Sequence, residues 1–217
     1  MAEDIFPEQE FTHESRSPSQ IPIFPLPSVV LFPNMMLPLH IFETRYRRMV
    51  NDCLNGEHYL GMILLREGWE RAEIDYFDVG GLGVITHVLK HPGGNMDIVL
   101  RGLSRYRVKS FVQQKPYLIG EIEILEEEWK DSPALEMATD HMLELFRRSL
   151  EKKPEETREK ILSQVNLLES PVDLANYVGS VLDIDVYKKQ DLLQAPTVRE
   201  RVRLLTSFLK GEVASFN

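Results

Sequence analysis

The sequence predicts an α+β protein in which a β-rich segment is followed by an α-helical bundle. Strand-sized apolar segments and turn residues dominate up to residue 125, with a single helical pattern among them. From Pro133 onward the apolar residues recur at helical spacing, and the acidic run Glu126-Glu127-Glu128 separates the two patterns. We therefore expect a β domain over residues 21–125 and a helical domain over residues 126–217.

Residues 1–20 are predicted to be a disordered acidic tail, because they have too few apolar side chains to offset the entropy of ordering. They lack the basic and apolar regions of a secretory signal. No apolar run in the chain approaches the ~18–20 residues that span a bilayer. Cys53 is the only cysteine and cannot form an internal disulfide, which favours a reducing compartment. We therefore expect a cytoplasmic protein without membrane contact.

The segment that begins at Ile21 is rich in proline, which fixes φ and removes a backbone donor. We expect it to be extended along a sheet edge or along the surface, with Val29–Phe32 as its strand. A helix over about 44–55 follows, which Thr44 or Glu43 can cap and Gly56 can end. Its predicted inward stripe has ideal helical spacing and consists of Tyr46, Met49, Val50, Cys53 and Leu54.

After this helix the chain is β in character up to residue 125. A Pro92-Gly93-Gly94 turn predicts a hairpin, and Gly80-Gly81-Leu82-Gly83 is expected to be a bulge or tight bend. This many strands with one short helix suggest a small barrel. The predicted strands are Tyr59–Leu65, Val84–Leu89, Met96–Leu100, Arg105–Phe111 and Tyr117–Leu125.

Five helices are predicted after the acidic run. The third begins at Ser170-Pro171, where serine can cap the helix and proline fits its first turn. We expect Gly211 to end the last one. The predicted helices cover about 133–152, about 155–168, a segment that starts at 171, Lys188–Leu193 and Thr197–Leu209.

The sequence predicts no catalytic residue, cofactor or metal site. A Walker loop needs glycine followed by lysine, and none of the 12 glycines is followed by lysine. The G-x-S-x-G motif of acyl transfer is absent. His87 and His91 have the spacing of a zinc pair on a helix, but on a strand four residues span about 13 Å. Cys53 is expected to be a small buried hydrophobe.

One basic stripe favours a nucleic-acid ligand as an alternative. Alternating basic residues on the solvent face of a strand are its ordinary explanation, and the net charge of −9 opposes phosphate binding. The stripe surrounds Tyr106 and consists of Arg101, Arg105, Arg107 and Lys109.

From Leu26 to Leu54 the proline-rich entry and the run H-I-F-E-T-R-Y-R resemble the opening of the Lon protease N-terminal, or substrate-binding, domain. The resemblance continues in R-G-L-S-R-Y-R-V and P-Y-L-I-G-E-I-E, and it covers about residues 21–210. It implies a PUA-like β pseudo-barrel with one early helix, followed by a helical bundle. The sequence departs from the family at Thr44, where proline is usual, and at Val79-Gly80-Gly81-Leu82, where V-G-T is commoner.

Full Lon enzymes continue into an ATPase module and a Ser/Lys peptidase module. This sequence has neither a Walker lysine nor D-G-x-S-A-G, so it resembles the stand-alone Lon-domain proteins. The resemblance therefore implies a polypeptide-binding module that engages unfolded segments or a partner protein, such as a protease, without chemistry. RNA binding through the PUA-like barrel and an unrecognised hydrolase are the alternatives, and the oligomeric state is left open.

A sheet edge interrupted by prolines, next to aromatic side chains, is a plausible groove for an extended peptide. Arg45 and Arg48 lie off the apolar stripe of the first helix and should be exposed. The aromatic residues of loop 67–78 could instead belong to the core or to a lid. The candidate contact residues are His40, Phe42, Arg45, Arg48, Trp69, Tyr76 and Phe77.

Overall fold

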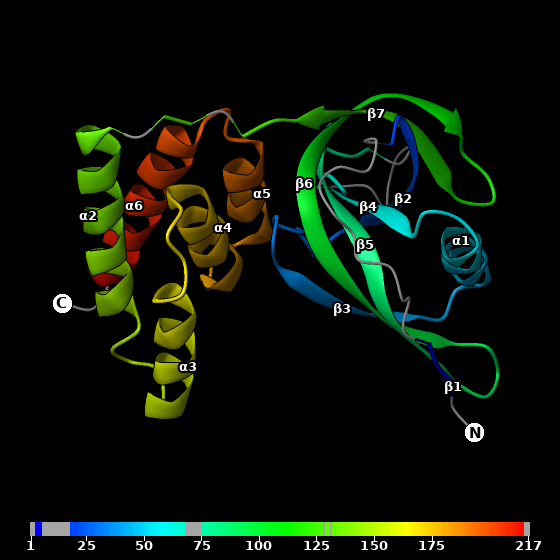
Figure 1. Ribbon diagram of the computed structural model, residues 1–217, viewed down its shortest axis with the longest axis horizontal. Coiled ribbons are helices and arrows are strands. Elements are labelled where there is room, and N and C mark those ends of the chain that lie inside the picture. Colours follow the sequence, from blue (N-terminus) through cyan, green and yellow to red (C-terminus); the bar gives the residue numbers. More distant parts are fainter. Residues whose placement is uncertain (1–2, 6–17, 68–74, 128, 131, 215–217) are drawn as a thin grey trace. The chain divides into compact units, whose positions relative to one another are not determined.

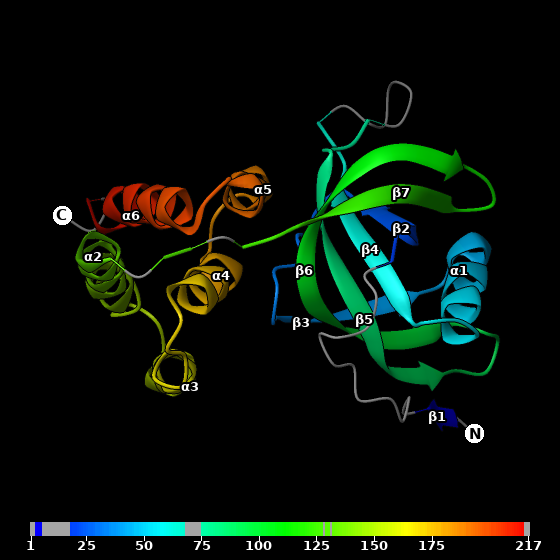
Figure 2. The same ribbon diagram turned by 45° about the horizontal axis from the view of Figure 1, so that its top comes forward.

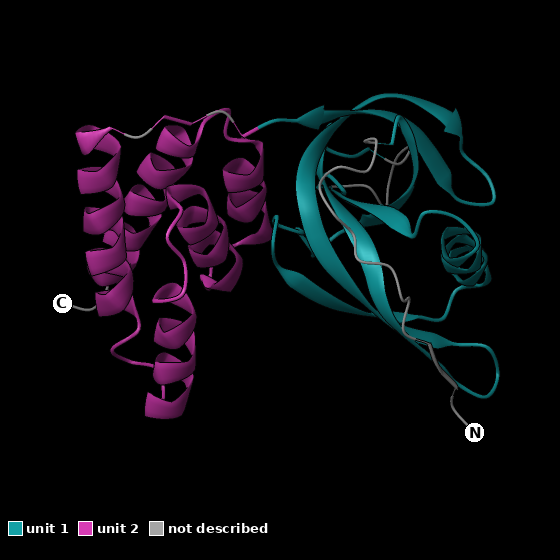
Figure 3. Ribbon diagram, in the orientation of Figure 1, with its two compact units in different colours: residues 1–126 teal, residues 127–217 magenta. Residues whose placement is uncertain are grey.

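The computed structural model describes residues 3–5, 18–67, 75–127, 129–130 and 132–214 (Figure 1). The chain divides into two compact units, Met1–Glu126 and Glu127–Asn217 (Figure 3). Unit 1 holds the strands and one helix, and unit 2 holds the remaining helices. The protein is therefore α+β, with its strands and most of its helices in separate units. None of the described helices is both long and apolar enough to cross a membrane.

Unit 1 is built on one mixed sheet whose strand order is β1-β5-β4-β2-β7-β6-β3. β5 also pairs with β6, so that the pairings of β5, β4, β2, β7 and β6 form a closed circuit (Figure 2). The β2–β4 pair is parallel and the other pairs are antiparallel. The strands are β1 (Glu3–Ile5), β2 (Gln20–Leu26), β3 (Met36–Ile41), β4 (Tyr59–Leu64), β5 (Val79–Lys90), β6 (Met96–Gln113) and β7 (Leu118–Leu125).

The proline-rich segment lies inside the sheet, so the prediction that it follows an edge or the surface was wrong. β2 pairs with β7 up to Ile23 and with β4 from Ile23 onward. Pro22 is aligned with Ile119 and Pro25 with Ile63, so each proline has a paired strand on one side only. A missing N–H can face the side without a partner, and the prolines are therefore compatible with a central strand.

The predicted strand at Val29–Phe32 was also wrong, because these residues form no strand. Leu31 and Phe32 are nonetheless buried core residues, at 2% and 1% exposure. A Cβ on Gly81 would lie 2.0 Å from the Leu31 carbonyl oxygen, and one on Gly102 would lie 2.1 Å from that of Phe32. The segment therefore packs its backbone directly over β5 and β6 at glycines instead of joining a ladder.

β5 and β6 are longer than the sequence predicts. The glycine-rich stretch lies within β5 and carries a register irregularity between Leu82 and Gly83, which confirms the predicted bulge. Arg105–Phe111 is the continuation of β6 and not a strand of its own, because no turn interrupts the chain after Leu100. The hairpin turn is confirmed: Gly93 and Gly94 adopt φ of +95° and +87°, a region that favours glycine.

Helix α1 (Thr44–Leu54) buries the predicted stripe of Tyr46, Met49, Val50 and Cys53. Its N-cap residue is Glu43, whose side chain does not cap the helix; the Glu43 carboxylate accepts a hydrogen bond from Arg45 Nε at 2.9 Å. The buried stripe packs into a core with residues from β2 through β6. Tyr46 contacts Phe24 of β2, with ring centroids 4.3 Å apart.

The expectation of a disordered tail is wrong at Glu3–Ile5, which forms β1. This strand pairs with the end of β5 in an antiparallel register that aligns Asp4 with Leu89. Backbone pairing to an available sheet edge needs little side-chain hydrophobicity. The acidic composition of this segment therefore does not indicate the strand. Residues 6–17 lie outside the described residues.

The described residues of unit 2 form five helices, and a serine or aspartate side chain caps three of them. Ser132 Oγ accepts from Leu135 N, Ser170 Oγ accepts from Val172 N, and Asp185 Oδ1 accepts from Tyr187 N. The predicted Ser170-Pro171 start is confirmed. The helices are α2 (Pro133–Ser149), α3 (Glu155–Val165), α4 (Pro171–Val181), α5 (Val186–Gln194) and α6 (Val198–Ala214).

Two helices of unit 2 extend beyond the predicted limits. The Asp185 cap places the start of α5 at Val186, ahead of the predicted Lys188. α6 continues through Gly211 to Ala214, so the predicted stop at this glycine was wrong. Gly211 does not adopt a left-handed φ, and a Cβ added to it would meet no neighbouring atom within 4 Å; a helical glycine costs only about 1 kcal/mol relative to alanine. One such residue does not end a helix.

Candidate functional site

His40 and Phe42 lie together where β3 leads into α1. Phe42 is 62% exposed, so a large part of its aromatic ring faces solvent. Its ring is nearly parallel to that of His40, with 22° between the planes and 6.1 Å between the centroids. The structure therefore brings two of the sequence-predicted candidates into one exposed aromatic pair.

Arg45 and Arg48 lie on the exposed face of α1, as predicted from their positions off the stripe. The Arg45 guanidinium lies over the Tyr46 ring at 4.5 Å from its centroid. Arg48 Nε lies 3.7 Å from the Asp52 carboxylate, and Asp52 also accepts a hydrogen bond from the Tyr117 hydroxyl at 2.6 Å. Both arginines have partners on or near their own helix, so each contact with a ligand would compete with an existing one.

The candidates in loop 67–78 belong to a different part of unit 1. Tyr76 is half-buried against Phe111, with ring centroids 4.8 Å apart, and it packs against the second core cluster of the unit. Phe77 lies under the Arg66 guanidinium, 4.3 Å from its centroid. Trp69 lies outside the described residues. The structure thus gives Tyr76 the core role that the sequence left open.

A shallow pocket of about 310 Å³ lies on the outer side of β3, β6 and β5. The strand registers align Pro38 with Val99 and His87, and His40 with Asp97 and Leu89. Aligned residues of neighbouring strands share one face of a sheet. We name these six residues the β3 face: Pro38, His40, His87, Leu89, Asp97 and Val99.

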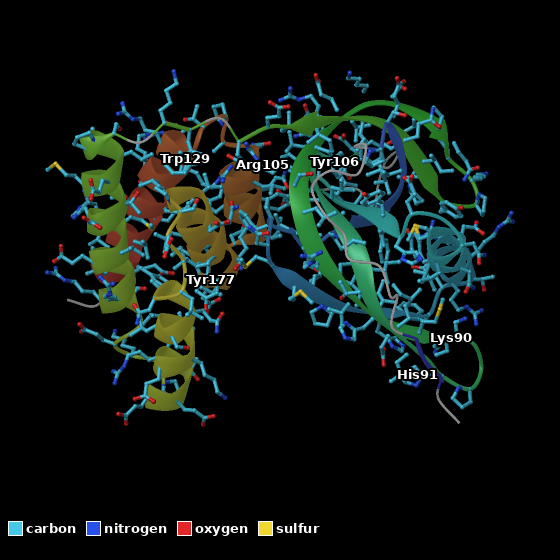
Figure 4. All side chains as sticks on the ribbon, in the orientation of Figure 1. Lys90, His91, Arg105, Tyr106, Trp129 and Tyr177 are labelled. Atoms are coloured by element: carbon cyan, nitrogen blue, oxygen red, sulfur yellow. The ribbon has the colours of Figure 1, made fainter. Side chains whose placement is uncertain are left out.

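Two histidines share one carboxylate at the β3 face. His40 Nδ1 lies 2.6 Å from Asp97 Oδ1, and His91 Nε2 lies 2.5 Å from Asp97 Oδ2. Figure 4 labels His91 at the turn between β5 and β6. Hydrogen bonds from His40 and then from His91 lower the pKa of the Asp97 carboxyl, which therefore stays ionised.

Sequence reasoning missed this arrangement. His91 was weighed only as a metal partner of His87, and Asp97 was not singled out. The Pro92-Gly93-Gly94 hairpin could have indicated that Asp97 lies near His91, but the alignment of His40 with Asp97 comes from the β3–β6 pairing, which no local sequence pattern shows. In the described ranges no group of three or more histidine, cysteine, aspartate or glutamate side chains is arranged to hold a metal ion.

The basic stripe of β6 does not form a continuous exposed track. Arg105 is only 2% exposed, so its placement on the solvent face was wrong. Arg107 is exposed, but its Nε lies 3.4 Å from the Asp78 carboxylate. Tyr106 is completely buried, and its hydroxyl donates to the Met62 carbonyl at 3.2 Å. No aromatic platform for stacked bases is thus available at Tyr106.

The only thiol in the chain is not poised for nucleophilic chemistry. Cys53 is 4% exposed, and burial raises its pKa to about 12. Nearby Tyr117 also has a raised pKa, about 12, because it is desolvated and its hydroxyl donates to Asp52. A thiol with this pKa is protonated at neutral pH, which makes Cys53 an inert core residue, as predicted.

Comparison with known proteins gives one consistent family. The model of the ATP-dependent protease La (LON) substrate-binding domain matches residues 20–211. The Lon protease of Dictyoglomus thermophilum is 28% identical over 207 residues, which is 95% of this chain and 26% of that protein. The Lon protease of Flavobacterium johnsoniae is 29% identical over 210 residues, with the same two coverages. The chain thus spans about a quarter of the length of these relatives.

Two solved structures share the fold. The N-terminal domain of the Mycobacterium avium complex Lon protease superimposes with a TM-score of 0.72 at 21% identity, over 88% of this chain and 98% of that one. A Lon N-terminal domain protein from Xanthomonas campestris gives 0.65 at 22% identity, over 87% and 98%. The match to the family model over nearly the whole chain shows that this protein belongs to the LON substrate-binding domain family.

Proposed function

We propose that this chain is a polypeptide-binding module that engages unfolded or partner protein segments without a chemical step. The observation that carries this proposal is the exposed Phe42, stacked on His40 at the rim of the β3 face. Contiguous exposed apolar surface with a polar rim is typical of protein-interaction sites, and Phe42 adds apolar surface next to the apolar residues of the β3 face. As part of the same proposal, unit 1 is a PUA-like pseudo-barrel and unit 2 a helical bundle.

The chemistry of the β3 face suits an extended polypeptide. Pro38, Leu89 and Val99 supply apolar contacts for a client side chain, while His40 and Asp97 can hydrogen-bond to its backbone. Burying a phenylalanine such as Phe42 contributes about 1.5–3 kcal/mol. By itself that corresponds to roughly a tenfold to hundredfold gain in affinity.

The relatives are Lon proteases, of which this chain spans only a part. Its proposed role is recognition, with any cleavage carried out by ATPase and peptidase modules that lie outside residues 1–217. Two sequence features support this division: the chain has no glycine followed by lysine and no D-G-x-S-A-G motif.

The test is the affinity for a fluorescently labelled unfolded protein, such as reduced and alkylated casein, measured by anisotropy. Phe42→Ser should weaken binding roughly tenfold or more, because the client loses its apolar contact. Val112→Ser is the matched control, since Val112 on β6 is 52% exposed and lies off the β3 face. Equal binding by Phe42→Ser and the parent protein, with both folded, would exclude the β3 face as the site.

RNA binding remains the alternative function, and the same assay separates the two. Binding to phosphates releases counterions, so RNA affinity falls steeply as the salt concentration rises. Binding through Phe42 and the β3 face should change little with salt. Submicromolar affinity for single-stranded RNA at physiological salt, lost when Arg107 and Lys109 are neutralised, would favour the alternative.

A further inference from the structure

A second and larger pocket lies within unit 2, where α2 and α4 begin. Its volume is about 630 Å³. Leu135 and Leu174 form its apolar floor and are buried, and Pro133 and Pro171 from the first turns of the two helices line it as well. The family assignment and the proposed function give this pocket no role.

Trp129 forms an aromatic wall of this pocket (Figure 4). The side chain is 37% exposed, so a large indole surface faces solvent. Among the described residues it makes neither a ring contact nor a cation–π contact. An indole is the aromatic ring that cations bind best, and an exposed one beside an apolar floor can receive an arginine or lysine side chain.

Three carboxylates surround the pocket: Glu136, Asp140 and Glu169. All three are exposed, and none forms an ion pair with a cation in the part of the chain that the structure describes. Other exposed carboxylates of unit 2 are paired: Glu144 lies 2.7 Å from Arg148, and Glu156 lies 2.7 Å from Lys160. The three carboxylates of the pocket therefore have no cation of the described residues that a ligand would have to displace.

The two helix starts do not turn the pocket into an anion site. The N-terminus of a helix carries about half a positive charge, so the two N-termini together carry about one positive charge. The three carboxylates carry three negative charges, which outweigh it. Their first amides are also occupied. Leu135 N donates to Ser132 Oγ at 3.2 Å, and Val172 N and Asp173 N donate to Ser170 Oγ at 3.2 and 3.4 Å. The pocket is therefore net acidic, with few free donors.

We propose that this pocket binds a basic side chain flanked by apolar residues on an extended polypeptide segment. The guanidinium or ammonium group lies over Trp129 and pairs with Glu136, Asp140 and Glu169, while the apolar neighbours contact Leu135 and Leu174. The charge of the rim and the apolar floor together select such a segment over an acidic one. This goes beyond the proposed function, because it assigns a second binding site to unit 2.

The test uses a short fluorescein-labelled peptide that alternates leucine and arginine, and a matched peptide with glutamate in place of arginine. The basic peptide should bind and the acidic one should not. Trp129→Ala, and separately the triple change Glu136→Gln, Asp140→Asn and Glu169→Gln, should each weaken binding about tenfold or more. Both sets of residues are exposed, so the helical circular dichroism and the melting temperature should be retained.

A charge-matched control removes three exposed carboxylates elsewhere in unit 2. The triple change Glu151→Gln, Glu155→Gln and Glu159→Gln should leave the affinity within about twofold, since exposed charges are screened at physiological salt. An equal loss of affinity in this control would show that only the overall charge matters and would overturn the proposal. An unchanged affinity of Trp129→Ala for the basic peptide would also overturn it. The same holds if the polyamine spermine competes as strongly as the unlabelled peptide.

The outcome is independent of the β3 face. Phe42→Ser should leave the affinity for the basic peptide unchanged, because Phe42 belongs to unit 1 and the pocket to unit 2. Loss of peptide binding in Phe42→Ser alone would assign the peptide to the β3 face and overturn the second site. Loss only in the Trp129 and carboxylate variants would support the second site even if the β3 face binds nothing.

Discussion

Arg201 of α6 donates from Nη2 to the Glu127 carboxylate at 2.8 Å, while no part of the arginine side chain is exposed. Its other nitrogens are also used, since Nη1 donates to Asn176 Oδ1 at 2.8 Å and Nε to the Leu192 carbonyl at 3.1 Å. One guanidinium therefore connects α6 to α4, to the end of α5 and to the segment that precedes α2. A buried charge of this kind is stable only with all its partners in place.

Arg201→Ala should destabilise unit 2 by about 3–5 kcal/mol, because it leaves a carboxylate and two acceptors without their donor. Urea unfolding followed by helical circular dichroism measures this change. The control is Arg203→Ala, which removes the exposed pair with Glu200 and should cost less than about 1 kcal/mol. Equal losses in the two variants would show that the buried network does not stabilise the unit.

Gly81→Ala should destabilise unit 1 by about 3 kcal/mol or more, because the new methyl group would lie 2.0 Å from a backbone oxygen that cannot easily move. Gly211→Ala is the opposite case. This glycine lies within α6 with open space around it, and alanine should stabilise the helix by about 0.5–1 kcal/mol. Thermal unfolding of the two variants should thus shift in opposite directions, and a neutral Gly81→Ala would contradict the close approach of Leu31.

Helix α1 offers a comparison of its two faces. Tyr46→Ala should cost about 3 kcal/mol or more, because it removes a buried ring that packs on Phe24. Changing Arg45 and Arg48 together to alanine should cost no more than about 1 kcal/mol, since their ion pairs are exposed. Denaturant midpoints provide the measurement. If the double arginine change also weakens capture of an unfolded client, α1 extends the binding surface beyond Phe42.

Cys53 should resist thiol reagents in the folded protein. Its pKa is raised from 9.0 to about 12, so at pH 8 almost no thiolate is present, and the side chain is also buried. Labelling with iodoacetamide should therefore proceed only after unfolding. Because the raised pKa disfavours the folded state once the unfolded thiol ionises, stability should fall as the pH rises from about 9 towards 12. Cys53→Ala should remove part of this alkaline decline.

The purified chain should neither hydrolyse ATP nor degrade casein above background. A Walker-type nucleotide site needs a loop of amides with a lysine, and the sequence contains no such motif. Phosphate release and casein fragments are simple to assay. Activity that a single point change abolishes would contradict the binding-module proposal, whereas activity unaffected by any such change would indicate a contaminant.

Local sequence patterns determined the helices and turns of this protein. The spacing of the apolar residues predicts the buried stripe of α1. The Ser170-Pro171 pair predicts the start of α4, and the two adjacent glycines Gly93 and Gly94 predict the hairpin turn. Each depends on residues within one or two helical turns or within one hairpin loop. The family itself was also recognisable from H-I-F-E-T-R-Y-R, because this run is short and distinctive.

Only the tertiary structure decided what depends on residues far apart in the chain. It placed β2 in the middle of the sheet, because β4 and β7 each pair with only half of it. It brought Asp97 between His40 and His91 through the strand registers, and it buried Arg201 because Glu127 and Asn176 surround its guanidinium. Charge and proline content argue for the surface when read along the sequence. Strand and hydrogen-bond partners from distant segments offset the free-energy cost of burying a proline or a charged side chain. No local sequence pattern shows which segments supply these partners.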